Sequence, residues 1–186
     1  MALPALLLLA GALAAVEYHD HRRQVQARRY RTPSGPARLA LGPSQWMPGA
    51  VAVTPTPGTL MACHVFGVVE HTGIWLGGDC IAELHGSGLV RGVSAQRFLH
   101  NRSGATIFCL SDSRHRALGS ERAAERAAKA LFTYRDYHLR RNNCHRFVWA
   151  CLSGQEQVIP SFSALNRLLA EHHDTHLYWD PARLSP

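Results

Sequence analysis

The sequence predicts an α+β fold in which an antiparallel sheet packs on helices. Short strand-like runs, separated by breaks that contain glycine and proline, occupy residues 46–110. From Ser120 onward, apolar residues recur at the three- and four-residue spacing of helices. Because strands come first, helices follow and no segment repeats, the order favours an antiparallel sheet with separate helices.

The strand signal is clearest around the turn Gly77-Gly78-Asp79, which joins two runs into a hairpin. His71 begins the first strand of this hairpin, and Glu83 lies on the return strand with His85 just beyond it. Strands are expected at residues 50–53, 64–69, 71–76, 80–84, 89–93 and 105–110.

Three helices are expected after the strands. The first begins after Ser120, a favourable N-cap residue, and the third covers about residues 163–172. The second begins at Cys144, after the N-cap Asn143, and stops before Gly154.

The second helix places a thiol in its first turn. Cys144, Phe147, Val148 and Cys151 recur at i, i+3, i+4 and i+7, so this face points inward. For Cys151 we expect an ordinary buried thiol. Around Cys144, the free N–H groups and the positive end of the helix dipole favour the thiolate, and such placement lowers a cysteine pKa from ~8.5 to about 3.5–7.5. Cys144 is therefore the candidate nucleophile.

A nucleophilic cysteine needs a base, and the base needs a polar group that orients its ring. His71 is the candidate base. Glu83 and His85 fall on one face of the adjacent strand because strand side chains alternate with period two. Either can accept the second ring N–H of the base, Glu83 as a carboxylate or His85 through a ring nitrogen.

Bulk composition limits the class of protein. The 186 residues are 46% hydrophobic and 18% charged, which fits one globular domain with extra segments. The net charge is +7, but no zinc-finger, helix-turn-helix or RNA-binding pattern accompanies it, so no nucleic-acid partner is expected. Five cysteines without a Cys-x-x-Cys pair favour free thiols.

The N-terminal segment predicts attachment to a membrane. We expect an anchor at residues 1–18, a basic and Pro/Gly-rich linker at 19–45 and the folded domain at 46–186. Residues 1–16 carry no charge but reach only ~24 Å as a helix, against a hydrocarbon core of ~30 Å. Five arginines follow within residues 17–31, which favours a cytoplasmic domain. The alternative is a signal peptide that is cleaved, with export of the domain.

Four short motifs together resemble one family of thiol enzymes. They are His71-Thr72-Gly73-Ile74-Trp75-Leu76-Gly77, Ile81-Ala82-Glu83-Leu84-His85-Gly86, a helix that ends at Tyr134 to Tyr137, and Asn143-Cys144-His145-Arg146-Phe147. In order and spacing, over about residues 46–155, they look like the lecithin:retinol acyltransferase-like (LRAT-like) group of the permuted papain-like NlpC superfamily. The resemblance implies a permuted papain-like fold, Cys144 as nucleophile, His71 as general base, and Glu83 or His85 as the third residue.

The resemblance also implies a function. We expect a membrane-associated thiol hydrolase or acyltransferase that acts on membrane lipid esters through an S-acyl-cysteine. The alternatives are an NlpC-type cysteine peptidase or amidase that cuts cell-wall peptides, and a non-catalytic interaction module tethered to the membrane. The chain departs from the family at His145 and Arg146, which replace Glu and His and alter the helix surface beside the nucleophile.

No cofactor, nucleotide or metal ion is expected. Gly86-Ser87-Gly88 lacks the length and the lysine of a phosphate loop. The histidines near the two ends of the chain lack further ligands at metal-site spacing, so they are interpreted as solvated surface. These groups are His19 with His21, and His172, His173, Asp174 with His176. Tyr178 and Trp179 are expected to form a packing tail.

Overall fold

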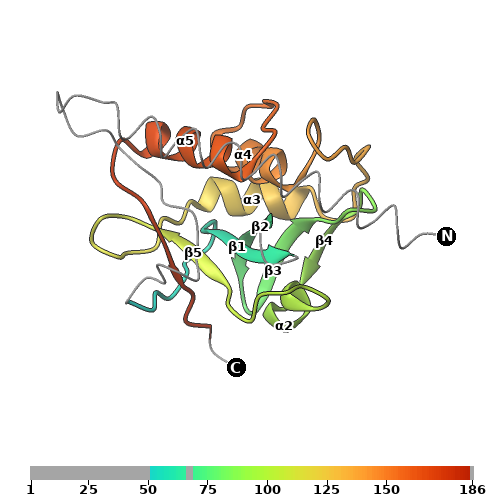
Figure 1. The fold of residues 1–186 in the computed structure, drawn as a ribbon. Helices are drawn as coiled ribbons and strands as arrows, with labels where there is room; N and C mark the ends of the chain where they lie inside the picture. The colour runs from blue at the N-terminus through green and yellow to red at the C-terminus, as the bar shows by residue number, and fades with distance from the viewer. Residues whose placement is uncertain (1–50, 66–68, 185–186) are drawn as a thin grey trace.

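The computed structural model describes residues 51–65 and 69–184, so the expected anchor and linker lie outside the described residues. Six strands form one antiparallel sheet in the order β4-β3-β2-β1-β5-β6, and helices pack against it (Figure 1). The strands are β1 (Leu60–Val65), β2 (Val69–Gly77), β3 (Cys80–Leu84), β4 (Val90–Val93), β5 (Phe108–Ser111) and β6 (Tyr178–Pro181). The helices are α2 (Ala95–Leu99), α3 (Glu121–Lys129), α4 (Cys144–Ser153) and α5 (Phe162–His173). The α+β prediction is confirmed.

The two faces of the sheet bury different side chains, because successive strand residues point to opposite faces. One face packs on α3, α4 and α5 and forms the larger core, which joins Ile74 and Leu84 to Phe147 and Leu165. The other face packs on α2 through Phe98. Figure 1 shows the three longer helices on one side of the sheet and α2 on the other. The sheet is therefore covered on both faces where the central strands lie.

The hairpin turn between β2 and β3 has the conformation that its residues favour. Gly78 and Asp79 have φ angles of 55° and 58°, and positive φ at both central residues is the mark of the type I′ turn. The Asp79 carboxylate also accepts a hydrogen bond of 3.0 Å from the backbone N–H of Ala95, at the start of α2. The turn thus fixes both the hairpin and the position of α2.

The helix boundaries follow the capping signals in the sequence. Ser120 and Asn143 cap α3 and α4 as predicted, and Ser161 caps α5. Gly154 ends α4 with a φ of 75°, a left-handed conformation that glycine adopts without strain. The third helix begins one residue earlier and ends one residue later than expected.

Three strand predictions differ from the structure. The strand expected at 64–69 is wrong, because β1 begins at Leu60 and ends at Val65. From Leu60 to Cys63 every residue is fully buried, so this central strand shows no alternation of polar and apolar residues. The strand expected at 105–110 begins only at Phe108. In place of the strand expected at 50–53, Val53 forms a single bridge with Ala182.

Two elements were not predicted at all. Helix α2 has five residues, of which only Phe98 is buried, so it is too short to show a helical period. Strand β6 pairs with β5 at the sheet edge and ends at Pro181, a residue type found at strand edges. The packing predicted for Trp179 is confirmed, since its ring is buried and its Nε1 donates to Asn166 Oδ1 at 2.8 Å.

Within residues 51–65 and 69–184, no helix combines the length and the apolar character needed to cross a membrane. The anchor predicted at residues 1–18 is not among these residues.

Gly73 provides a test of how closely β2 and β3 pack. It pairs with Glu83, and a Cβ atom built on it would lie 2.6 Å from Ile81 Cγ2 and 2.9 Å from the carbonyl oxygen of Ala82. We expect Gly73→Ala to lower the free energy of unfolding by about 1–3 kcal/mol through overpacking, as measured by urea denaturation.

The matched control is Gly86→Ala, because a Cβ atom at Gly86 meets nothing within 4 Å. Its free energy of unfolding should change by less than about 0.5 kcal/mol. Equal losses in the two variants would contradict the close approach at Gly73.

Candidate active site

Cys144 is the first residue of α4, and its side chain is 5% exposed. The preceding residue, Asn143, fixes this position through three hydrogen bonds. Its Oδ1 accepts from the backbone N–H of Arg146 at 3.0 Å, and its Nδ2 donates to the carbonyl oxygens of Leu139 and Ile159 at 2.9 Å each. The helix N-terminus is thus held from both sides, with the thiol in its first turn.

The β2–β3 hairpin places a histidine and a carboxylate beside each other. His71 Nε2 lies 2.7 Å from Glu83 Oε2. His71 comes just beyond the last β2–β3 pair, Gly73 with Glu83, and its ring contacts Phe98 at a centroid distance of 5.3 Å. Because the ionised carboxylate only accepts, Nε2 carries a proton toward Glu83 and Nδ1 is left for another partner.

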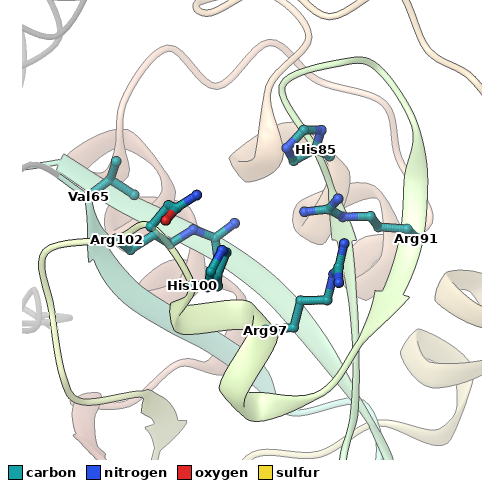
Figure 2. A pocket seen from close by; sticks show the side chains of 7 residues that line it. Val65, His85, Arg91, Arg97, His100 and Arg102 are labelled. Atoms are coloured by element: carbon teal, nitrogen blue, oxygen red, sulfur yellow. The ribbon is translucent and has the colours of Figure 1, made fainter.

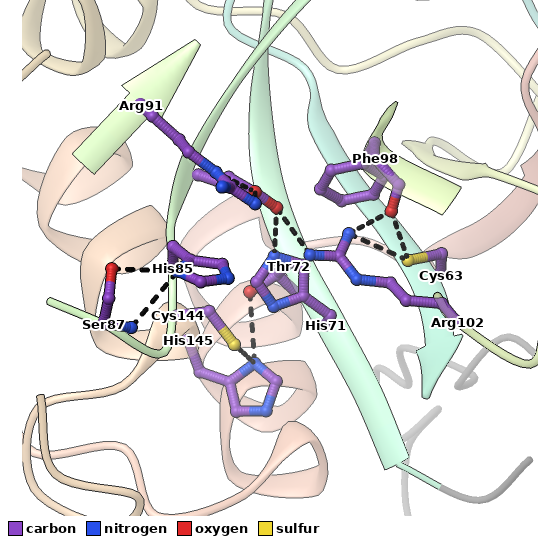
Figure 3. Close-up of polar contacts among 11 residues, drawn as sticks. Cys63, His71, Thr72, His85, Ser87, Arg91, Phe98, Arg102, Cys144 and His145 are labelled. Atoms are coloured by element: carbon purple, nitrogen blue, oxygen red, sulfur yellow. Dashed lines mark hydrogen bonds and ion pairs between the residues drawn. The ribbon is translucent and has the colours of Figure 1, made fainter. Parts of the chain in front are cut away.

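That other partner is the Cys144 thiol, which interacts with His71 closely enough that each group shifts the pKa of the other. Figure 3 shows the thiol next to the rings of both His71 and His145. The structure therefore brings together Cys144, His71 and Glu83, which the sequence analysis had singled out on separate elements.

His145 is a second imidazole at the thiol. Its Nδ1 lies 3.8 Å from Cys144 Sγ and 3.2 Å from Thr72 Oγ1. The side chain is 5% exposed and its ring packs on Phe162 at 5.6 Å. Of the two residues that depart from the family pattern, His145 thus contacts the thiol itself, whereas Arg146 is partly exposed and pairs with Glu156.

The electrostatics of this group favour an ion pair. Burial raises the pKa of the Cys144 thiol, but the positive charges of His145 and His71, together with their hydrogen bonds, outweigh burial and hold the pKa well below its ordinary value. Burial lowers the pKa of His71, but the Cys144 thiolate and the bond to Glu83 outweigh it, so the pKa of His71 is raised. A thiolate next to an imidazolium is the form that both shifts favour.

Of the other four cysteines, Cys63, Cys109 and Cys151 are buried and Cys80 is partly buried. Burial raises the pKa of Cys63, Cys109 and Cys151 to about 12 each, and it also raises the pKa of Cys80. All five are free thiols. The buried role predicted for Cys151 is confirmed, and Cys144 is the one thiol whose pKa is lowered.

Glu83 is fully buried and accepts hydrogen bonds from three charged groups. In addition to His71, Arg91 Nε bonds its Oε1 at 2.8 Å and Arg102 Nη2 bonds its Oε2 at 2.7 Å. Burial raises the pKa of this carboxyl, but His71 and Arg102 outweigh burial and hold the pKa far below its usual range. Glu83 therefore stays ionised while it holds the ring of His71.

His85 makes different contacts. Its Nδ1 accepts a hydrogen bond of 3.2 Å from the backbone N–H of Ser87 and lies 2.9 Å from Ser87 Oγ. Burial and the charge of Arg91 lower its pKa. Of the two residues that the sequence analysis left open as partners of His71, Glu83 is the one that bonds its ring.

Three residues of this site were not predicted. Arg91 lies directly opposite Glu83 in the β3–β4 ladder, so a register for these strands would have revealed the opposite-charge pair. Arg102 follows α2, and nothing in its sequence neighbourhood indicates a contact with Glu83. His145 is next to Cys144 in sequence, but consecutive helix residues do not share a face, so only the packing of α4 shows the contact.

No three His, Cys, Asp or Glu side chains among residues 51–65 and 69–184 converge in the manner of a metal site. His172 packs on Trp149 at 5.7 Å and on His173 at 5.0 Å, and His176 is exposed. His19 and His21 lie outside the described residues. The site combines a thiol of lowered pKa, an imidazole and a carboxylate, which are the groups that acyl transfer through a thiol requires.

Comparison with known proteins identifies no family for this chain. No protein-family model matches the sequence, and no curated protein matches it. What the site does is therefore inferred from the geometry of Cys144, His71 and Glu83.

Proposed function

We propose that this protein is a thiol hydrolase or acyltransferase of the permuted papain-like, LRAT/NlpC type, which acts on lipid esters through an S-acyl intermediate on Cys144. The observation that carries the proposal is the chain of contacts from the Cys144 thiol to His71 and from His71 to Glu83. The order of these residues, with the histidine hairpin before the nucleophile helix, also supports it.

In the first half of the proposed reaction, the Cys144 thiolate attacks the ester carbonyl carbon and a carbon–sulfur bond forms. The imidazolium of His71 then donates its Nδ1 proton to the leaving alcohol as the carbon–oxygen bond breaks. The backbone N–H of Cys144 donates to no atom of the described residues, so it is open to bind the carbonyl oxygen as negative charge develops there.

In the second half, neutral His71 takes a proton from water, or from the amine or hydroxyl of an acceptor. The oxygen or nitrogen attacks the thioester, the carbon–sulfur bond breaks, and the thiolate–imidazolium pair returns. Glu83 keeps the ring of His71 in one orientation through both halves, because it holds Nε2 by a bond of 2.7 Å. The acceptor that reaches the thioester first decides between hydrolysis and transfer.

Lipid esters are proposed as substrates because of the segment that precedes the folded domain. Residues 1–16 are apolar and uncharged, and the five arginines within residues 17–31 favour contact with anionic lipid headgroups. A domain held at a bilayer meets acyl esters at high local concentration. A peptidase or amidase would use the same three residues on an amide carbonyl.

The lowered pKa of Cys144 predicts selective alkylation. At mildly acidic pH, iodoacetamide should label Cys144 faster than the other four cysteines, because its lowered pKa leaves a larger fraction of this thiol ionised. As the pH falls, the rate constant of Cys144 should decline at a lower pH than the rate constants of the other thiols. Peptide mass spectrometry measures each site, and equal labelling of all five thiols would rule out the proposed nucleophile.

The base is tested by His71→Ala, which should lower the rate of ester cleavage at least ~100-fold, the usual scale for loss of a general base. His176→Ala is the matched control, since His176 is exposed and far along the chain from the site. A stopped assay with a soluble acyl ester measures both variants.

The orienting carboxylate is tested in the same assay. Glu83→Gln should lower kcat more than His85→Gln does, because only Glu83 bonds the ring of His71. A larger kcat loss in His85→Gln would reverse the assignment.

The chemistry itself is tested by trapping the intermediate. Incubation of the full chain with phosphatidylcholine vesicles should give an acyl adduct on Cys144, detected by intact and peptide mass spectrometry, together with released fatty acid. An N- or O-acylated lipid product would add transfer to hydrolysis. The absence of both adduct and fatty acid, with cleavage of a peptide amide instead, would replace the lipid proposal with the peptidase alternative.

A further inference from the structure

A cavity of about 430 Å³ opens beside the catalytic hairpin. Its walls carry three arginines and two histidines and no acidic side chain. The lining residues are Val65, His85, Arg91, Arg97, His100, Asn101 and Arg102. Figure 2 shows the side chains of Arg91 and Arg97 reaching into the same space, with Arg102 and His100 across from them. We call this cavity the arginine pocket.

The arginine pocket carries more positive charge than the neighbouring carboxylates neutralise. Glu83 is the carboxylate that pairs with Arg91 and Arg102, and the same Glu83 also bonds His71. Arg97 forms no hydrogen bond or ion pair through its side chain with any described residue, so its guanidinium donors are open to a ligand. Two of the three arginines thus share one carboxylate and the third has none, which leaves a site for an anion.

Arg91 and His85 each keep an N–H donor that bonds no described residue. Arg91 uses Nε and Nη2 on Glu83 Oε1, which leaves Nη1 available. His85 accepts the backbone N–H of Ser87 at Nδ1, so in the neutral ring Nε2 carries the proton and is a donor. Phosphate and carboxylate oxygens are the acceptors that guanidinium groups bind with paired, charge-assisted hydrogen bonds.

The pocket adjoins the reacting groups. Arg102 Nη2 and His71 Nε2 both bond the same oxygen of Glu83, at 2.7 Å each. One carboxylate thus separates the wall of the arginine pocket from the ring of His71, which interacts with the Cys144 thiol.

We propose that the arginine pocket binds an anionic group of the acyl substrate, a phosphate or a carboxylate, and so selects esters that carry one. The claim that the anion is part of the substrate rests on the proposed function. The claim that the pocket binds an anion depends only on the residues that line it. His85, which the sequence analysis placed among the candidate catalytic residues, contributes to recognition of the substrate in this assignment.

The first experiment measures binding without turnover. Inorganic phosphate is titrated into the full chain carrying Cys144→Ala at constant ionic strength, with NMR signals of the arginine side chains as the readout. We expect saturable binding that becomes at least about tenfold weaker in Arg97→Gln, since one charged set of hydrogen bonds is lost. The matched control is Arg122→Gln, an exposed arginine on α3, which should bind as before. Equal phosphate affinity in the two variants, or binding that does not saturate, would contradict anion binding in the arginine pocket.

The second experiment asks whether the anion is part of the substrate. Two soluble esters with the same acyl chain are compared, one with a phosphate on the alcohol and one with a hydroxyl. The ratio of their kcat/KM values should favour the phosphate ester and fall at least about tenfold in Arg97→Gln, but not in Arg122→Gln. Phosphate binding with a ratio near one in every variant would assign the pocket to a free anion and overturn the substrate claim. If no ester acylates Cys144 while phosphate still binds, the proposed function fails and the anion site remains.

Discussion

The carboxylate of Glu83 is the interaction on which the site depends. It is fully buried, and it accepts from His71 on its own hairpin, from Arg91 on β4 and from Arg102 after α2. Removing a carboxylate from water is costly, and only several charged donors with good geometry offset the cost. Breaking such a buried group by removing one partner costs roughly 3–5 kcal/mol, because the remaining charge has no compensation. Glu83 therefore holds β2, β4 and the segment after α2 together through its side chain.

This arrangement also affects the pKa of His71. A histidine bonded to an isolated buried carboxylate would hold its proton strongly, because the pair would be poorly screened. Here Arg91 and Arg102 share the negative charge of Glu83, so the carboxylate orients the ring of His71 without carrying its full charge toward it. The same two arginines also line the arginine pocket. The orientation of the His71 ring and the positive charge of the neighbouring cavity thus depend on the same two arginines.

The sequence predicts features that depend on a few neighbouring residues better than contacts between residues that are far apart in the chain. The caps Ser120 and Asn143, the stop at Gly154 and the Gly78-Asp79 turn are local, and each was read correctly from a few residues. The pairing of Cys144 with His71 was reached only by combining distant motifs. The contact of Arg102 with Glu83 depends on how α2 packs on the sheet, and no local pattern encodes that packing. Strand β1 was misplaced because burial on both faces removes the alternation that marks a strand.

The low pKa of Cys144 is a property of the finished tertiary structure. A ten-residue helix such as α4 is marginal by itself, and His71 lies on a strand far away in the sequence. In a newly made or unfolded chain all five thiols are therefore ordinary, and none is unusually prone to oxidation or to attack on stray electrophiles. The pKa of Cys144 falls only as the residue becomes buried, because the contacts that favour the thiolate also bury the sulfur. The low pKa of this sulfur is therefore acquired only when the chain folds, and it is lost when the chain unfolds.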